Sequence, residues 1–363
     1  MNYSRRRDRL RALIKKAGGE ALLVTHEINV GYLTGFSGDS SYLLIHANGE
    51  TILSDSRYDT QLAEECPGLE VATRTSSKPM AALISELVGS HRFTSLLIEG
   101  DSLSKSQFDR FSEILPSTEL LSTSGLVEQL RAIKDKDELA EIRRSIHLAQ
   151  RAFDAIRATM TPGQSERLIA ANLEHQIRLL GGTGCAFKPI VGVGPRAALP
   201  HAIPTDRRIE ESPFVLIDWG AKAGKYTSDL TRVLVTGKAP AKLAKVYQTV
   251  LDAQLAAIAA IRPGVTAAEV DRAARKVIED AGHGKHFGHG LGHGFGLEIH
   301  EEPRMSSSNT RALEPGMVVT VEPGIYLPGW GGVRIEDDVL VTVDGHEVLT
   351  SVPKDFESSI VDM

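Results

Sequence analysis

The sequence predicts two domains, an α/β domain over residues 1–131 followed by an α+β domain over residues 132–363. Three observations support this fold class. At 363 residues the chain is long for a single hydrophobic core. Short apolar runs alternate with helical patterns up to about residue 130, as in α/β folds. Beyond that point the helical patterns are longer, and strand-like runs and a hairpin pattern lie around them.

The first domain opens with an arginine-rich pattern at residues 5–17, which predicts a solvated amphipathic helix ended by Gly18 and Gly19. After this helix, the alternation of short apolar runs with helical spacing predicts an α/β arrangement. We expect strands at 21–25, 42–46, 51–54 and 94–99, and helices at 57–66, 78–88 and 104–115.

The second domain begins where charged residues cluster from Lys134 onward, which predicts a linker followed by a long helix up to Met160. Pro263 and Gly264 separate two later helical patterns. We therefore expect further helices at 165–180, 241–261 and 267–281.

Composition excludes several classes of function. With 41 Lys and Arg against 47 Asp and Glu, the net charge of −6 argues against a nucleic-acid partner. Cys66 and Cys185 lie too far apart for a thiolate zinc motif or a disulfide framework. No apolar run is long enough for a membrane helix, and the first residues lack a secretory signal. We expect a cytoplasmic protein with no membrane partner.

Two aspartates stand in a segment that reads as a β-hairpin, residues 212–237. If the turn is centred on Ala223 and Gly224, Asp218 and Asp229 face each other directly, with Cβ atoms about 4.5–5.5 Å apart. Two carboxylates at that distance repel unless a cation or a shared proton lies between them. The alternative is that one of them only caps the turn or pairs with Arg232, and the pair alone does not decide between these readings.

Two glutamates strengthen the case for a cation. Strand alternation places Thr320 and Glu322 on one face, and it places Arg334, Glu336 and Asp338 on one face of a later strand. Buried glutamates are rare unless they are paired or bind a metal. Together with the two aspartates, these residues favour a metal site built from carboxylates.

A window rich in glycine and histidine can add a nitrogen ligand. Seven glycines lie between Gly282 and Gly296, and five of the twelve histidines overlap this window. His289 and His293 are four residues apart, but the alternating glycines make a zinc-binding helix implausible. The glycines more plausibly let the backbone pack closely while His293 or His289 points inward.

Other catalytic motifs are absent or weak. The sequence contains neither a P-loop nor the G-x-S-x-G motif of serine hydrolases. Residues 192–197 match a loose dinucleotide-binding pattern, but Pro195 and Pro200 oppose the phosphate-binding helix that such a site needs.

The order of the candidate ligands resembles that of the "pita-bread" metallopeptidases, which include methionine aminopeptidase, Xaa-Pro aminopeptidase, prolidase and the metal-free relative creatinase. The matching motifs are IDWG and SDLTR, GHGLGHGFGLEIHEEP, TVEPGIY and GGVRIED. The first domain, with YLTGFSG and SDSRY, resembles the creatinase-type N-terminal domain. This resemblance implies a pita-bread catalytic domain at 132–363 and favours the proline-directed branch. The matching ligands are Asp218, Asp229, His293, Glu322 and Glu336.

The resemblance also implies a role for each site residue. Asp229 and Glu336 would bridge two divalent ions, with Asp218, His293 and Glu322 completing their shells. Glu322 would also act as general base. His201 and His300 would contact the substrate and stabilise the tetrahedral intermediate, and His289 would line the pocket. Arg334 would orient Glu336 or meet the substrate. An oxygen-rich set of this kind suits Mn²⁺, with Co²⁺ or Zn²⁺ as alternatives.

The expected function is therefore that of a dinuclear-metal exopeptidase that cleaves between an N-terminal residue and proline. Its substrate would be a proline-containing peptide, and the sequence leaves open whether the enzyme is an aminopeptidase or a strict dipeptidase. The family further implies a homodimer. The alternative is a catalytically retired, peptidase-like module that only binds peptides.

Overall fold

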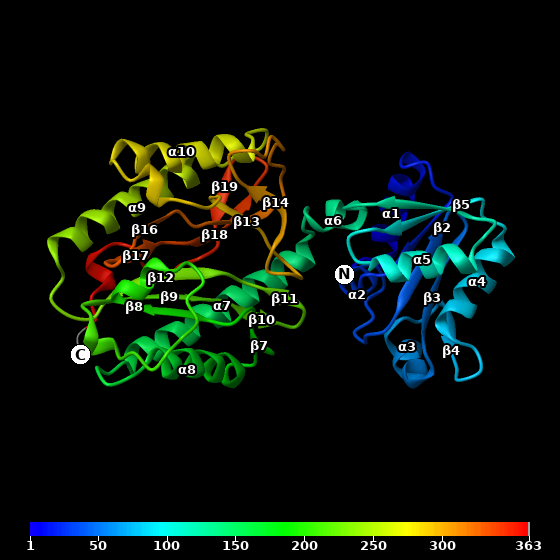
Figure 1. Ribbon diagram of the computed structural model, residues 1–363, viewed down its shortest axis with the longest axis horizontal. Coiled ribbons are helices and arrows are strands. Elements are labelled where there is room, and N and C mark those ends of the chain that lie inside the picture. Colours follow the sequence, from blue (N-terminus) through cyan, green and yellow to red (C-terminus); the bar gives the residue numbers. More distant parts are fainter. Residues whose placement is uncertain (362–363) are drawn as a thin grey trace. The chain divides into compact units, whose positions relative to one another are not determined.

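The computed structural model describes residues 1–361, which divide into two compact units, Met1–Arg131 and a second unit that begins at Ala132 (Figure 1). Within this described range, no helix is both long and apolar enough to span a bilayer. Each unit is described by itself.

The first unit is built on one mixed six-stranded sheet with the order β4-β3-β2-β1-β5-β6. Its strands are β1 (Ala21–Val24), β2 (Tyr42–His46), β3 (Gly49–Asp55), β4 (Glu70–Arg74), β5 (Ser95–Glu99) and β6 (Glu119–Thr123). Its helices are α1 (Tyr3–Lys16), α2 (Glu27–Thr34), α3 (Asp59–Glu65), α4 (Met80–His91), α5 (Lys105–Ile114) and α6 (Leu126–Arg131), with the 3-10 turn η1 (Ser56–Tyr58) before α3.

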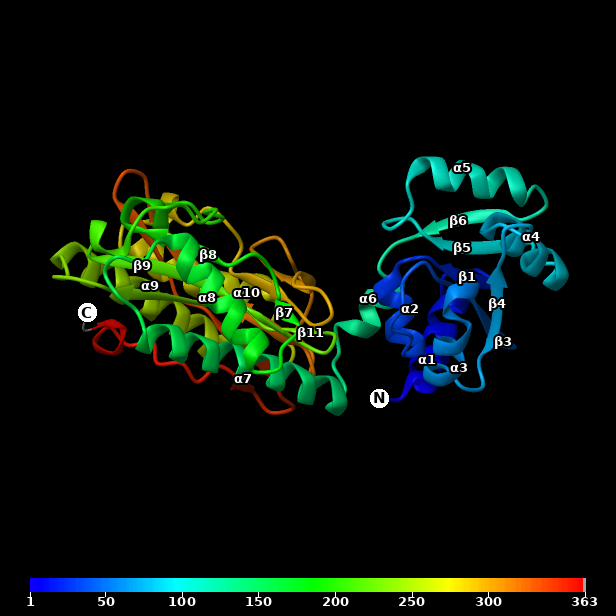
Figure 2. The same ribbon diagram turned by 90° about the horizontal axis from the view of Figure 1, so that it is seen from below.

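Helices cover both faces of this sheet. Helices α4 and α5 lie on one side and α1 and α2 on the other, as Figure 2 shows. The buried Leu83 of α4 and Phe111 of α5 pack with Leu23 and Leu44 of the central strands in one hydrophobic cluster. This burial of apolar side chains supplies the main stabilisation of the unit.

Four elements of the first unit escaped the sequence analysis. Strands β4 and β6 are the two edges of the sheet, and most of their side chains are at least partly exposed, so they lack a continuous apolar run. Helix α2 has only eight residues, most of them buried, and therefore shows no amphipathic period. The short α6 likewise gives no repeating pattern.

The arginines of α1 are less solvated than the helical pattern predicts. Arg6 is buried, its guanidinium lies 4.1 Å from the centroid of the Tyr32 ring, and it donates to the Tyr32 carbonyl. Arg7 and Arg11 both pair with Glu50. The basic run therefore attaches α1 to its own unit.

In the second unit, two pairs of helices flank the strands. Figure 1 shows α7 and α8 on one side and α9 and α10 on the other. The helices are α7 (Lys136–Ala158), α8 (Glu166–Leu179), α9 (Ala241–Ala260) and α10 (Ala267–Asp280). One hydrophobic cluster joins α7 and α8 to β8, β9 and β12, and a larger one joins α9 and α10 to the strands on their side.

The strands of this unit form four small sheets, with the orders β12-β9-β8, β14-β13-β15-β18-β19, β11-β10-β7 and β16-β17. An isolated bridge between Thr231 and Glu336 links the first sheet to the second. The strands are β7 (Gly184–Cys185), β8 (Ile190–Val193), β9 (Phe214–Trp219), β10 (Ala221–Ala223), β11 (Tyr226–Thr227), β12 (Leu230–Val235), β13 (Gly292–Gly294), β14 (Glu301–Met305), β15 (Val318–Val321), β16 (Gly324–Leu327), β17 (Gly331–Arg334), β18 (Asp337–Val341) and β19 (His346–Val348).

Most of the charged residues expected to form a linker instead begin helix α7. The Asp135 side chain accepts from the backbone amides of Asp137 and Glu138, both at 2.9 Å, and Glu138 accepts from the Asp135 amide. This reciprocal capping box satisfies amides that a helix start leaves open.

The hairpin register differs from the expected one. Ala223 pairs with Tyr226 and Asp218 pairs with Thr231, so the turn is formed by Gly224 and Lys225. Gly224 has φ +56°, a conformation that favours glycine. The expected centre was wrong by one residue, and Asp229 is therefore a diagonal neighbour of Asp218 instead of its direct partner. Moving the turn centre by one residue shifts the cross-strand pairing by two residues. Side chains alternate between faces with a period of two, so Asp218 and Asp229 still lie on the same face.

The glycines of the histidine-rich window are required by close backbone packing. A Cβ on Gly294 would lie 2.2 Å from the Glu302 carbonyl oxygen, and one on Gly292 would lie 2.3 Å from that of Thr320. Without a side chain at these two positions, β13 can lie close to its neighbours β14 and β15.

We predict that Gly294→Ala lowers the free energy of unfolding by about 1–3 kcal/mol, because the added methyl group forces backbone apart. Gly163→Ala is the matched control, since a Cβ there meets nothing within 4 Å. The control should change stability by less than about 0.5 kcal/mol. Thermal and urea unfolding of both metal-free variants would test this, and equal stabilities would contradict it.

Candidate metal centre and active site

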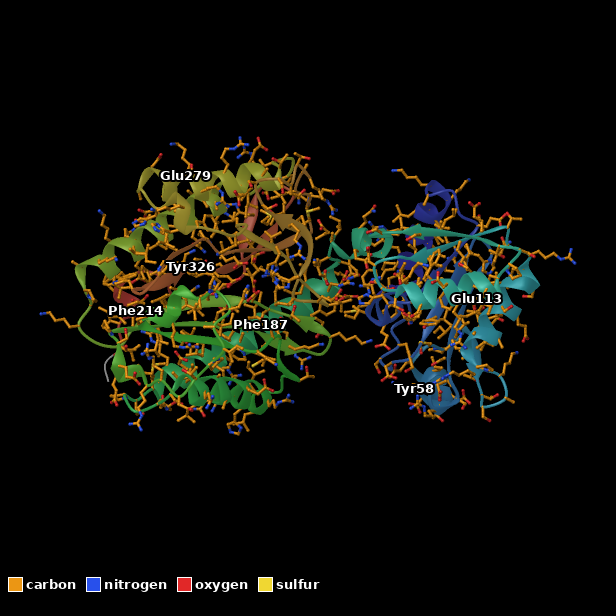
Figure 3. All side chains as sticks on the ribbon, in the orientation of Figure 1. Tyr58, Glu113, Phe187, Phe214, Glu279 and Tyr326 are labelled. Carbon is orange, nitrogen blue, oxygen red and sulfur yellow. The ribbon has the colours of Figure 1, made fainter. Side chains whose placement is uncertain are left out.

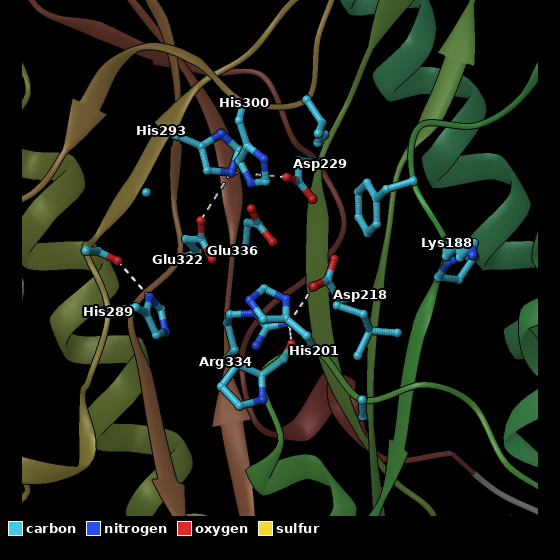
Figure 4. A pocket seen from close by; sticks show the side chains of 18 of the residues that line it. Lys188, His201, Asp218, Asp229, His289, His293, His300, Glu322, Arg334 and Glu336 are labelled. Atoms are coloured by element: carbon cyan, nitrogen blue, oxygen red, sulfur yellow. Dashed lines mark hydrogen bonds and ion pairs between the residues drawn. The ribbon is translucent and has the colours of Figure 1, made fainter. Parts of the chain in front are cut away.

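One pocket of about 910 Å³ in the second unit collects every residue that the sequence analysis singled out as a site residue. Figure 4 shows the acidic side chains pointing into a common space, with His293 and His300 on one side and His201 and Arg334 on the other. The predicted residues that line the pocket are Asp218, Asp229, His293, Glu322, Glu336, His201, His289, His300 and Arg334.

Strands from two sheets carry the five candidate ligands. Asp218 lies on β9 and Asp229 directly before β12, in one sheet. His293 lies on β13, Glu322 directly after β15, and Glu336 directly before β18, in the other. The ends of these strands therefore meet at the pocket.

The ligand atoms are close enough to share cations. Carboxylate oxygens of Asp218, Asp229 and Glu336 all lie within 4.8 Å of one another. His293 Nε2 lies 3.5 Å from Asp229 Oδ2 and 3.5 Å from Glu322 Oε1. The imidazole nitrogen thus joins the same cluster.

Burial and mutual repulsion hold these carboxyl groups toward their protonated forms when no cation is present. Burial, followed by the charges of Glu336 and Asp218, raises the pKa of Asp229 well above its ordinary value. The pKa of Glu336 is raised well above its ordinary value by burial and then by Glu322 and Asp218. Burial also raises the pKa of Glu322, to about 7. Such a group of acids is stable only with protons or cations among them.

Unsatisfied oxygens point to cations. Asp218 Oδ1 and Glu336 Oε1 are buried and have no hydrogen-bond partner among the described residues. Their other oxygens are held, since Arg334 pairs with Asp218 and Thr231 Oγ1 donates to Glu336 Oε2 at 2.6 Å. Buried carboxylate oxygens without a donor are costly, and a divalent metal satisfies them. The donor set therefore fits a metal centre.

His293 presents a neutral nitrogen to this cluster. Its Nδ1 lies 3.0 Å from the Gly294 carbonyl oxygen, which can only accept, so Nδ1 carries the proton and Nε2 keeps its lone pair. Burial, with the nearby His300, lowers the pKa of His293 to about 3. The imidazole is thus ready to act as a ligand near neutral pH.

Arg334 has a different partner from the one we expected. It pairs with Asp218 and donates to Thr231 Oγ1 at 3.1 Å and to Tyr326 Oη at 2.8 Å. Thr231, rather than Arg334, holds the Glu336 carboxylate. Arg334 therefore reaches Glu336 only through Thr231, and it lines the pocket, where contact with a substrate stays a prediction.

The alternative that Arg232 pairs with one of the two hairpin aspartates is also wrong. Arg232 forms a buried ion pair with Asp337 at 2.7 Å. It also donates to the Glu336 carbonyl at 2.6 Å, and so supports the backbone behind the acidic cluster.

His289 belongs to a chain of hydrogen bonds that ends at Asp218. Its Nδ1 donates to the Gly290 carbonyl at 2.7 Å, and its Nε2 accepts from the Tyr326 hydroxyl at 2.9 Å. Tyr326 in turn accepts from Arg334, which pairs with Asp218. Burial lowers the pKa of His289 to about 4, so the ring is neutral near pH 7.

Helix α10 holds the segment that carries His289. The fully buried Asp271 accepts from the Leu291 amide at 3.1 Å and pairs with Arg275. Arg275 donates to the carbonyls of Phe287 and His289 at 3.1 and 2.9 Å. The backbone is thus fixed on both sides of His289, at Phe287 and at Leu291.

His201 and His300 line the more open part of the pocket. Both are exposed, and the His300 ring centroid lies 4.4 Å from that of His293. The pocket therefore brings together two exposed imidazoles and the acidic cluster.

Several pocket residues escaped the sequence analysis. Tyr326, in the pocket wall, stands inside the motif TVEPGIY, and Thr231, which holds Glu336 from outside the wall, stands inside SDLTR, so those motifs carried a signal for both. The exposed cations Lys188 and Arg304 also line the pocket, but no local pattern marks them. Phe187 contributes to the apolar wall, and Figure 3 labels it together with Tyr326.

Comparison with known families agrees with both halves of the chain. Residues 140–343 match the metallopeptidase family M24, and residues 6–133 match the creatinase/prolidase N-terminal domain.

Full-length relatives extend this agreement. A Xaa-Pro dipeptidase of Pyrococcus furiosus is 36% identical over 353 residues, which cover 96% of this chain and 99% of that protein. The structure of a Xaa-Pro dipeptidase from Bacillus anthracis is 38% identical with a TM-score of 0.94, covering 98% of this chain and 99% of that one. An X-Pro aminopeptidase from Thermotoga maritima is 35% identical with a TM-score of 0.88, covering 96% and 99%.

These matches confirm the predicted resemblance and the predicted fold class. The chain belongs to the metallopeptidase family M24, in the group that carries a creatinase/prolidase N-terminal domain.

Proposed function

We propose that this protein is a Xaa-Pro dipeptidase, which hydrolyses the peptide bond between an N-terminal residue and a C-terminal proline. The observation that carries the proposal is the convergence of four carboxylates and one imidazole on one pocket. Full-length relatives named Xaa-Pro dipeptidase and X-Pro aminopeptidase support the choice of reaction.

In this proposal Asp218, Asp229, His293, Glu322 and Glu336 would hold two divalent cations. Four carboxylates offset the charge of two such ions. When bound, the ions supply Lewis acidity toward the scissile carbonyl and toward water. The hard, oxygen-rich donor set favours Mn²⁺, and Co²⁺ and Zn²⁺ are the alternatives.

Glu322 is the proposed general base. Its side chain is 17% exposed, and Thr320 Oγ1 donates to its Oε1 at 3.2 Å. From this position its carboxylate can accept a proton from the attacking water and later release it to the leaving amine.

His201 and His300 are the proposed contacts to the reacting carbonyl. Both line the pocket beside the acidic cluster. As hydrogen-bond donors they would stabilise the negative charge that develops on the carbonyl oxygen. Arg334, His289 and Tyr326 would hold Asp218 in place through their chain of hydrogen bonds.

The choice of a dipeptide over a longer peptide rests on charge. Lys188 and Arg304 both line the pocket and are both exposed. Arg304 pairs in the sheet with His293, so it lies next to a candidate ligand. In a dipeptide the proline itself carries the free C-terminal carboxylate, and two cations can pair with it. In a longer peptide this carboxyl group forms the next peptide bond and has no charge.

A homodimer, implied by the family resemblance, and the cytoplasmic location expected from the sequence remain part of this proposal. Light scattering coupled to gel filtration measures the first, and cell fractionation measures the second. A retired peptide-binding module is less well supported, because a full ligand set with unsatisfied oxygens is retained.

Removal of metal should abolish hydrolysis of Xaa-Pro dipeptides, and Mn²⁺ should restore it. Asp229→Asn should lower activity by about 100-fold or more, since even residues behind a metal site cost 10–100-fold. Asp252→Asn, an exposed position on α9, is the control and should keep both activity and metal. Elemental analysis should find two ions per chain in the control. Full turnover of the metal-stripped enzyme would sink the proposal, and peptide binding without metal or hydrolysis would favour the retired module.

Stabilisation by metal should increase with pH. The pKa of Glu322 is about 7 in the folded, metal-free protein against an ordinary 4.5, so the folded state holds a proton that the unfolded chain has lost. The metal-free protein therefore loses stability as pH rises through this window. In the folded protein His293 is already neutral above about pH 3, so metal binding displaces a proton from Glu322 but none from His293 between pH 5 and 7.5. We expect the rise in melting temperature caused by Mn²⁺ to be larger at pH 7.5 than at pH 5. A constant or falling difference would contradict this.

A free carboxylate after proline should be recognised by Lys188 and Arg304. Arg304→Ala should raise KM for a Xaa-Pro dipeptide by about tenfold, because the loss of one charge-assisted hydrogen bond weakens binding by about this factor. It should raise KM much less for the same dipeptide with a C-terminal amide. Arg311→Ala is the control, an arginine that is absent from the pocket wall. If wild-type enzyme cleaves Xaa-Pro-Xaa peptides as fast as dipeptides, the protein is an aminopeptidase instead.

A further inference from the structure

The segment that carries His201 is a loop, residues 194–204, which we call the His201 loop. It follows β8 and begins with the 3-10 turn η2 (Gly194–Ala198). Residues 200–204 all line the pocket. The exposed fraction of Ile203 is 81%, whereas its neighbour Ala202 is buried in the larger hydrophobic cluster, so apolar burial holds only part of the loop tip.

One buried carboxylate joins the two ends of this loop. Glu166, in the first turn of α8, is 0% exposed. Before the loop tip it accepts from the Val193 amide at 2.9 Å and from Arg196 Nε at 2.9 Å. After the tip it accepts from the Thr205 amide at 2.8 Å and from Thr205 Oγ1 at 2.7 Å. A single side chain thus acts as a clasp between the two ends.

The loop has further polar contacts, including backbone hydrogen bonds from Leu199 to Arg196 at 3.0 Å and from Ala202 to Leu199 at 3.1 Å. Arg196 also donates to the Ile203 carbonyl at 2.5 Å, and its own position is set by Glu166. Arg334 reaches the Pro200 carbonyl only at 3.5 Å. The Thr205 carbonyl accepts from the Arg167 amide at 3.0 Å, which fixes the end of the loop to the start of α8.

We propose that Glu166 is a positioning residue for the peptidase reaction, and that it acts by closing the His201 loop so that His201 faces the substrate. This inference rests on the proposed role of His201. Glu166 lies outside the pocket wall and touches no candidate ligand. Its effect on catalysis is therefore transmitted through the loop.

The clasp requires an acceptor-only group. All the neighbours of the Glu166 carboxylate are donors, and a carboxylate accepts from all of them. Glutamine has an NH₂ group in place of one carboxylate oxygen, and this donor would face the donors around it. Glutamine also lacks the negative charge that pairs with Arg196. Glu166→Gln should therefore open the loop, but it also destabilises a buried ion pair and can impair folding.

Thr205 offers a milder pair of variants. Thr205→Val removes the hydroxyl donor to Glu166 and keeps the branched shape, and Thr205→Ser keeps the hydroxyl. We expect Thr205→Val to lower kcat/KM for a Xaa-Pro dipeptide by about tenfold, because small misplacements of a catalytic group are costly. Thr205→Ser should stay within about twofold of wild type. Tyr247→Phe, which removes a buried hydrogen bond to the Lys354 carbonyl away from the pocket, controls for general loss of stability and should keep full activity.

A double-mutant cycle with His201→Ala separates positioning from a general structural effect. If Glu166 acts through His201, Thr205→Val should have almost no further effect on kcat/KM in the His201→Ala background. An undiminished tenfold loss in that background would overturn the inference. The metal content should be equal in all variants.

Hydrogen exchange supplies a readout that does not depend on turnover. Amides of residues 197–204 should exchange faster in Thr205→Val than in Thr205→Ser, and those of β9 should be unchanged. Equal exchange of the loop in the two variants would overturn the inference. A wild-type enzyme with no activity on Xaa-Pro dipeptides would defeat the proposed function instead, and the exchange result would still report on the clasp.

Discussion

The structure of the second unit must hold together four carboxylates that face one pocket and repel one another. Burial raises the pKa of Asp218, Asp229, Glu322 and Glu336, and the charges of neighbouring carboxylates raise the pKa of the last three further. Nothing in hydrophobic packing favours such a cluster, and it is costly unless cations or protons enter it. The surrounding structure can be understood as the means of holding these groups together.

Two kinds of support hold the acidic groups in place. The strands that carry them are fixed by hydrophobic clusters on both sides, one with α7 and α8 and one with α9 and α10. Polar contacts then set individual side chains, since Arg334 holds Asp218 and Thr231 holds Glu336. Thr231 contributes twice, because its backbone bridge to Glu336 also joins the two sheets.

Sequence alone predicted the long helices and the composition of the pocket well, because both leave local signals. Helices α7 to α10 have clear apolar periods and recognisable ends, and the ligands stand in characteristic motifs. Register was harder, since a turn at Gly224–Lys225 and one at Ala223–Gly224 keep the same residues on the same face. The partner of Arg334 could not be predicted, because alternation along one strand says nothing about which neighbouring strand lies opposite. Edge strands β4 and β6 and the cations Lys188 and Arg304 depend on tertiary contacts, and local patterns do not encode those.

The order of the ligands along the chain has a consequence for biosynthesis. Asp218 and Asp229 leave the ribosome first, and Glu336 follows only near the C-terminal end. The bridge from Thr231 to Glu336 and the Arg232–Asp337 pair form equally late. A nascent chain therefore has no complete site to load, and its acidic hairpin must stay protonated or solvated until the last strands arrive. In the proposed function, cations would therefore stabilise only chains whose two sheets have already come together.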